Sequence, residues 1–147
     1  MIAREVDFPP VWLAGFAALG FVAGRIYPLA FPYAPLVAAI VVAVALGLMV
    51  IAVFQMVFAR TTVIPRRDPM RLVTSGLFRF SRNPIYLADA ILLAGLYIHW
   101  QALAALPLVA LFMYLITMRF ILDEEARLAE HFGADFATYK NRTRRWI

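Results

Sequence analysis

The segment between Pro35 and Ala59 contains no charged side chain, and its only strongly polar one is the amide of Gln55. A helix of this length and composition can cross a bilayer with some tilt. The chain of 147 residues is 64% hydrophobic and has a mean hydropathy of +0.79, whereas a soluble domain is usually closer to half apolar. Because the excess lies in blocks, the sequence predicts an all-α integral membrane protein.

Three further apolar runs predict three further spans. The first of them is interrupted by Arg25, and the last contains Pro107, which is expected to kink it. The stretch His99-Trp100-Gln101 predicts a tight turn at an aromatic interface belt. We therefore expect one polytopic domain over residues 1–147, with four transmembrane helices at about 12–31, 35–59, 84–98 and 101–118 and a tail at 119–147 that includes an amphipathic helix.

Loop charges predict the direction of insertion. The two short loops between spans carry no Lys or Arg, whereas the long loop and the C-terminal tail are rich in them. By the positive-inside rule, the long loop and both termini are expected in the cytoplasm. The basic residues of the long loop are Arg60, Arg66, Arg67, Arg71, Arg79 and Arg82, and the tail beyond the acidic pair adds Arg127, Lys140, Arg142, Arg144 and Arg145.

The basic residues also bear on partners and source. A net charge of +5 is compatible with nucleic-acid binding, but the cations flank apolar spans and are better explained as topology determinants, so no nucleic-acid partner is expected. Every cation except Lys140 is Arg, which is typical of a GC-rich genome and suggests a bacterial inner membrane. Glu5 and Asp7 make a removable signal peptide unexpected.

The third span begins with a strong helix-start pattern. Asn83 is expected to cap the helix, and Pro84 suits the first helical position, where a missing N–H costs nothing. Asp89 lies six residues beyond the cap, roughly 9 Å along the axis and just below the membrane interface. One face of this helix is expected to carry Tyr86, Asp89 or Ala90, Leu93 and Tyr97.

The last two spans form a hairpin, so the start of one and the end of the other lie at the same level. Ionisable groups near membrane depth are costly and are functional candidates by default. Each has a simpler alternative, since Arg82 and Arg119 can reach lipid phosphates, Asp89 can pair with an Arg, and Glu124 and Glu125 can form a solvated helix face. The groups brought together are Arg79, Arg82, Asn83, Tyr86 and Asp89 with Arg119, Asp123, Glu124 and Glu125.

The helix of the fourth span has no breaker at its end and is expected to continue beyond the membrane until Gly133. Asp135 is expected to cap a last short helix. Leu128, Phe132 and Phe136 line one side, so the tail is expected to lie back on the protein or on the membrane surface.

Several chemistries lack the residues that they need. The chain has no cysteine, no Gly-rich phosphate loop and no nucleophile elbow. His99 and His131 lie on opposite sides of the membrane in the expected topology, so no metal site is expected.

Three motifs in order, over roughly residues 60–146, resemble the isoprenylcysteine carboxyl methyltransferase family, which is related to the phospholipid N-methyltransferases. These motifs are Arg82-Asn83-Pro84 with Tyr86, then Glu124-Glu125, then Phe132-Gly133 with Phe136 and Tyr139. The family often has His at the position of Asn83, and it has Gly where Ala88 stands.

The resemblance implies S-adenosylmethionine as methyl donor and a lipid or other hydrophobic acceptor that enters from the bilayer. Carboxylates suit the donor's ribose hydroxyls and ammonium group, and Arg suits its carboxylate. Asp89, Tyr86 and Arg82 are the candidate catalytic residues. The candidate cofactor-binding residues are Arg82, Asn83, Pro84, Tyr86, Leu87, Glu124, Glu125 and Tyr139.

Two alternatives remain open at the level of sequence. One is an NADPH-dependent membrane reductase of the steroid-reductase type, which has a similar C-terminal helix pattern. The other is a non-catalytic lipid-binding or scaffold protein, which Ala88 favours and the intact Glu124-Glu125 pair disfavours.

Overall fold

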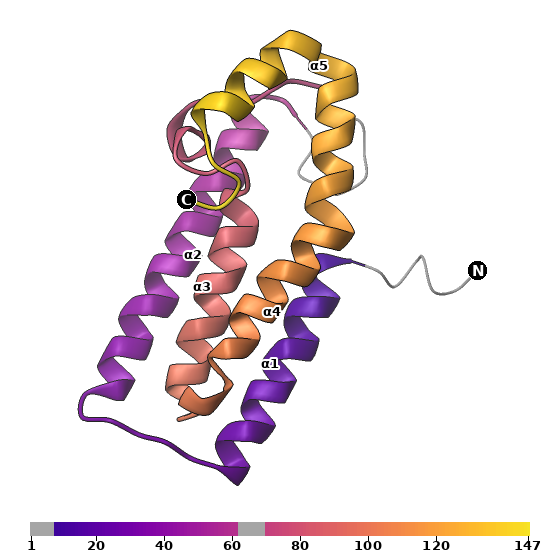
Figure 1. The fold of residues 1–147 in the computed structure, drawn as a ribbon. Coiled ribbons are helices and arrows are strands. Elements are labelled where there is room, and N and C mark those ends of the chain that lie inside the picture. Colours follow the sequence, from indigo (N-terminus) through magenta and orange to yellow (C-terminus); the bar gives the residue numbers. More distant parts are fainter. Residues whose placement is uncertain (1–7, 62–69) are drawn as a thin grey trace.

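The structure, a computed structural model, describes residues 8–61 and 70–147 and is helical, with no strand in these two ranges (Figure 1). Four helices form a bundle, and the last of them continues through a π-helical turn into a fifth helix that projects from one end. The helices are α1 (Pro9–Ile26), α2 (Ala34–Phe58), α3 (Pro84–His99), α4 (Pro107–Ile116) and α5 (Leu122–Arg142), and the shorter turns are η2 (Gly76–Arg79), η3 (Leu103–Ala105) and η4 (Thr117–Ile121).

The helices agree with the expected spans, with two corrections. α1 ends at Ile26 rather than near residue 31, because Pro28 disfavours a helical conformation at Tyr27, which has φ −130° and ψ 70°. Pro107 does not kink a span: it begins α4, and the residues before it form the 3₁₀ turn η3. A proline is tolerated there because the first helical N–H groups have no partner in the helix.

Within the described residues, three helical segments are long and apolar enough to cross a membrane: α1, α2 and the run Leu103–Arg142 that contains α4 and α5. The helix α3 is apolar but has only 16 residues. The expected all-α architecture of an integral membrane protein is therefore confirmed; α3 is shorter than the three segments that are long enough to cross a membrane.

The helix α3 occupies the centre of the bundle and contacts α1, α2 and α4. Alanines on one face of α2, including Ala38, Ala45 and Ala52, are almost completely buried. On α3, a methyl group added at Gly95 would lie 2.8 Å from the side chain of Val42. Small residues let helix backbones approach closely in a membrane, which accounts for the long contact between α2 and α3.

A close contact also joins α1 to α3. The ring of Tyr97 lies against Gly20, and its hydroxyl donates a buried 2.7 Å hydrogen bond to the backbone carbonyl of Phe16. Leu93 and Phe112 complete this part of the core and are fully buried.

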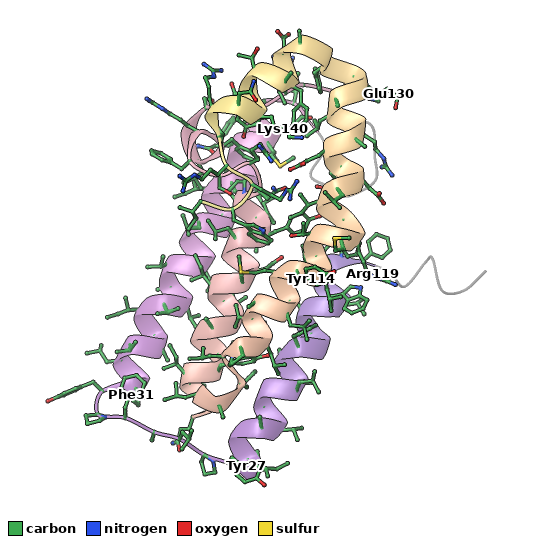
Figure 2. All side chains as sticks on the ribbon, in the orientation of Figure 1. Tyr27, Phe31, Tyr114, Arg119, Glu130 and Lys140 are labelled. Atoms are coloured by element: carbon green, nitrogen blue, oxygen red, sulfur yellow. The ribbon has the colours of Figure 1, made fainter. Side chains whose placement is uncertain are left out.

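The two short connections meet at one end of the bundle. The backbone N–H of Leu29 donates to the carbonyl of Gln101 at 2.7 Å, and the tight turn expected there is formed with Gln101 at φ 59°. At the other end, the Arg119 guanidinium lies 4.9 Å from the ring centroid of Trp12. Figure 2 shows Arg119 beside the start of α1, with Tyr27 at the opposite end. The chain therefore places the start of α1 and the end of α4 together.

The tail folds back on the protein, as expected. Gly133 has φ 47° and ψ −117°, which breaks the helical geometry of α5, and the second part of α5 turns toward the end of α2 (Figure 1). Phe136 and Tyr139 then pack with Phe78 and Ala52 in a small apolar cluster. The tail thus lies over the loop that leads into α3.

Some expectations concern residues outside the described ranges. These are the predicted absence of a signal peptide, which involves Glu5 and Asp7, and the loop charges at Arg66 and Arg67.

Candidate functional site

The loop before α3 is fastened to α2. Gly76 has φ 61°, a left-handed conformation that favours glycine. The next N–H, of Leu77, donates to the side-chain carbonyl of Gln55 at 3.1 Å. This polar residue near the end of α2 thus fixes the loop that delivers Arg82 to the start of α3.

The start of α3 differs in one respect from the prediction. Pro84 occupies the first turn, as expected, and Asn83 occupies the N-cap position. The predicted capping bond is wrong, however, because the Asn83 side chain makes no hydrogen bond to the helix. Its amide instead donates to the backbone carbonyl of Arg145 at 3.0 Å, while its own N–H donates to the Ser81 hydroxyl at 3.1 Å. Asn83 therefore ties the start of α3 to the tail.

Arg82 points into the protein and its side chain is 8% exposed. One terminal nitrogen donates to Glu125 Oε1 at 2.8 Å. The other donates to the carbonyls of Thr143 and Lys140 at 2.9 and 3.1 Å. Its Nε is buried and has no hydrogen-bond partner among the described residues. This burial argues against Arg82 as a residue that merely reaches lipid phosphates.

Glu125 lies between two arginines. Arg145 binds it with two hydrogen bonds, from Nε to Oε1 at 2.9 Å and from NH2 to Oε2 at 2.8 Å, while Arg82 shares Oε1. Burial by itself would raise the pKa of Glu125, but the hydrogen bonds and charges of Arg145 and Arg82 outweigh it and hold the pKa below its usual value. We call Arg82, Glu125 and Arg145 the charged triad.

Glu124 has a different partner from its neighbour. It accepts a 2.7 Å hydrogen bond from the hydroxyl of Tyr86, which is buried on α3. Glu124 itself is half-buried. The acidic pair is therefore not a solvated helix face, because Glu125 belongs to the charged triad and Glu124 joins α5 to α3.

Asp89 lies on the same face of α3 as Tyr86, about one turn further along. It is 7% exposed and makes no hydrogen bond or ion pair within the described parts of the chain. The alternative that Asp89 serves only to pair with an arginine is therefore not supported. Ala88 beside it is fully buried, and Leu87 is half-buried.

Tyr139 lies at the edge of this group. Its hydroxyl donates to the carbonyl of Phe78 at 2.6 Å, and burial raises its pKa to about 12. In this position it holds the second part of α5 against the loop that leads into α3.

The structure also reveals polar residues that sequence reasoning did not select. The carbonyls of Lys140, Thr143, Arg144 and Arg145 accept hydrogen bonds from the segment 81–83. We call this set of bonds the C-terminal clasp. No sequence pattern indicates these bonds, because backbone acceptors have no residue signature and Arg145 is one basic residue among several in the tail.

These observations define a class: an integral membrane protein of helices in which polar side chains of two sequence-distant motifs meet at one end of the central span. The profile of the phospholipid methyltransferase family matches residues 33–135, and the chain belongs to this family. The expected resemblance is thereby confirmed, since the isoprenylcysteine methyltransferase-like group falls within the same family. No curated protein and no solved structure matches the chain.

The family match has a defined extent. It begins at the start of α2 and ends just after the break in α5. It includes Arg82, Tyr86, Asp89 and the acidic pair, and it excludes Tyr139 and the carbonyl acceptors of the C-terminal clasp.

Proposed function

We propose that the protein is an S-adenosylmethionine-dependent methyltransferase that acts on a lipid or other hydrophobic acceptor at the cytoplasmic surface of the membrane. Membership of a methyltransferase family supports the reaction class. The observation that carries the proposal is that two motifs 38 or more residues apart are joined by two bonds, from Tyr86 to Glu124 and from Arg82 to Glu125, on the helix that also carries the buried Asp89.

The donor set fits the proposed cofactor. Arg82 has a buried Nε without a partner in residues 8–61 and 70–147, and this donor suits a carboxylate or another acceptor. Glu124 is half-buried and can accept from hydroxyl or ammonium groups. The ring of Tyr86 and the carboxylate of Asp89 suit a nearby cationic sulfur. When bound, S-adenosylmethionine supplies an activated methyl group, and the protein's task is mainly to position the acceptor in line with it.

The remaining predicted contacts have supporting roles in this proposal. Asn83 and Pro84 set the start of α3, and Leu87 and Tyr139 lie beside it. Both oxygens of Glu125 accept hydrogen bonds from arginines, so Glu125 acts on the cofactor site by orienting Arg82. Within the described ranges, no three His, Asp or Glu side chains gather where they could hold a metal ion.

The acceptor is proposed to enter from the bilayer. The helix α3 is short and starts at Pro84, so the groups above Asp89 lie near the membrane boundary. A hydrophobic acceptor is already concentrated in the membrane, and only its reactive end needs to reach Asp89, which can orient it or accept its proton. A bacterial inner membrane with both termini in the cytoplasm is part of this proposal.

Calorimetry on the purified protein in detergent tests the cofactor. We expect binding of S-adenosylmethionine and S-adenosylhomocysteine, and none of NADPH. Glu124→Gln should weaken binding by about tenfold or more, because a hydrogen bond to a charged group contributes about 1.5–3 kcal/mol. The matched control is Glu130→Gln on the exposed surface of α5 (Figure 2), which should bind as the unchanged protein does.

Two results would contradict the proposal. Binding of NADPH alone would favour the reductase. Cofactor binding without transfer of labelled methyl groups to any component of a bacterial lipid extract would favour a non-catalytic lipid-binding protein.

A further inference from the structure

We propose that Arg145 is a positioning residue of the cofactor site, so that the tail beyond the family match completes the site. Arg145 holds Glu125, and Glu125 in turn presents Arg82. This inference rests on the proposed function and goes beyond it, because it places a determinant of cofactor affinity in a segment that the family match does not include.

The first argument is geometric. Arg145 contacts both oxygens of Glu125, at 2.9 and 2.8 Å, whereas Arg82 contacts only one of them. A bidentate arginine–carboxylate pair fixes the orientation of the carboxylate as well as its distance. Without Arg145, Glu125 keeps a single bond to Arg82 and loses the partner that sets its orientation.

The second argument is electrostatic. The side chains of Arg82 and Glu125 are 8% and 10% exposed, whereas that of Arg145 is 33% exposed. A buried charge that loses one of its partners is costly, and it reduces that cost by moving toward water or by changing its protonation. Removal of Arg145 therefore acts on the two more deeply buried members of the charged triad rather than on Arg145's own surroundings.

The third argument concerns the N–H group of Arg82 that has no acceptor among the described residues. Glu125 and the carbonyls of Thr143 and Lys140 occupy its terminal nitrogens, and its Nε is left buried without a partner among the described residues. The orientation of that Nε depends on these contacts. Because Arg145 restrains Glu125, and its own carbonyl accepts from Asn83, it restrains Arg82 from two directions.

The protonation of Glu125 distinguishes a positioning role of Arg145 from a merely structural one. With Arg145 present, hydrogen bonds from two arginines keep the pKa of Glu125 low against the opposing effect of burial. Without it, one of these two partners is lost, and Glu125 takes up a proton at a higher pH. In the described ranges, Arg82 before α3 and Arg145 in the tail bind Glu125 directly, and Glu124 is next to it on α5. Tyr86 on α3 binds Glu124, and Tyr139 interacts electrostatically with Arg82.

The test measures the affinity for S-adenosylmethionine by calorimetry between about pH 5 and 8, with thermal unfolding as a check on folding. Arg145→Ala should lower affinity by about tenfold or more at pH 7, and the loss should grow as the pH falls. Arg145→Lys keeps the charge but not the bidentate contact, so it should restore affinity only in part. The control Arg142→Ala removes an exposed basic residue of the same tail and should leave affinity within about twofold at every pH.

Each outcome decides something. If the unchanged protein does not bind the cofactor, the proposed function fails and the inference fails with it. If the unchanged protein binds the cofactor, and both Arg145 variants bind it as tightly as the unchanged protein does at every pH, only the inference is overturned. If Arg145→Ala does not fold, Arg145→Lys decides, and a normal affinity in that variant overturns the inference. A uniform loss of affinity without pH dependence also overturns it, because a general loosening of the tail would produce that result.

Discussion

Glu124 and Glu125 are neighbours in sequence and have separate partners. Successive residues on an α-helix are about 100° apart, so adjacent side chains face different surroundings. Glu124 meets Tyr86 on α3, and Glu125 meets the two arginines of the charged triad. Two full positive charges hold Glu125 ionised, so its response to pH should differ from that of an ordinary exposed carboxylate.

The pH dependence of stability should reflect Glu125. Its pKa in the folded protein lies below its ordinary value of 4.5, so the charged form contributes stability above that pH, and this contribution is lost as pH falls through the lowered pKa. Thermal unfolding in detergent from about pH 7 to 3 should show a steeper loss for the unchanged protein than for Glu125→Gln. Parallel curves for the two proteins would contradict the assignment.

Asp89 should matter for turnover more than for cofactor affinity. It is buried on α3 without a hydrogen-bond partner in the described chain, and Asp89→Asn keeps its size while removing its charge and basicity. We expect methyl transfer to fall by about a hundredfold if it acts as a base, while the affinity for S-adenosylmethionine changes little. The matched control is Asp135→Asn on the exposed side of α5, and normal turnover of Asp89→Asn would remove it from the catalytic residues.

At this scale the sequence predicted that the two motifs meet, and the structure joins Tyr86 to Glu124 and Arg82 to Glu125. Tyr86 and Glu124 were expected together because a hairpin brings the start of one span beside the end of the next, and this is confirmed. The partners of Asn83 and Arg145 could not be predicted, because each depends on where the tail returns after the break at Gly133. The roles of the individual site residues stay predictions.

Among the elements, the passage from α4 to α5 was expected to be continuous, and it is, but its π-helical turn η4 was not expected. No proline or glycine marks the segment Thr117–Ile121. Such turns are frequent at functional sites, and this one lies just before the acidic pair. Apolar length and charge predict that a helix continues, and they carry no information about its local winding.

The contact between α1 and α3 gives a prediction about packing. A methyl group at Gly20 would lie within the space of the Tyr97 ring, which is fully buried and fixed by its bond to Phe16. Gly20→Ala should therefore destabilise the protein by about 1–3 kcal/mol. Gly15→Ala on the same helix is the control, because nothing lies within 4 Å of the added methyl group there. Equal unfolding curves for the two variants would show that the helices do not meet as described.

For the whole molecule, the four apolar helices, their order and the returning tail could be predicted from hydropathy, loop charges and the glycine at the break. The orientation in the membrane stays a prediction, because the fold shows which ends lie together and not which side faces the cytoplasm. The described start of α1 and the tail lie toward one end, and Tyr27 lies at the other (Figure 2).

A labelling experiment decides the orientation, and the chain suits it because it contains no cysteine. Single cysteines at Ile147 and at Tyr33, which are 73% and 78% exposed, can be treated with a membrane-impermeant thiol reagent. We expect Tyr33→Cys to react in intact spheroplasts and Ile147→Cys to react only after permeabilisation. The reverse pattern would place the polar end outside the cell.

The C-terminal clasp joins residues that leave the ribosome at different times. Asn83 and the carbonyl to which it donates are 62 positions apart in sequence. When α3 has just been synthesised, Arg82 therefore lacks both the Glu125 carboxylate and the backbone carbonyls that it binds in the folded protein. These acceptors become available only after the hairpin, the π-helical turn and both halves of α5 have been synthesised. Residue order thus prevents the polar end from assembling before the segment up to Arg145 has been synthesised.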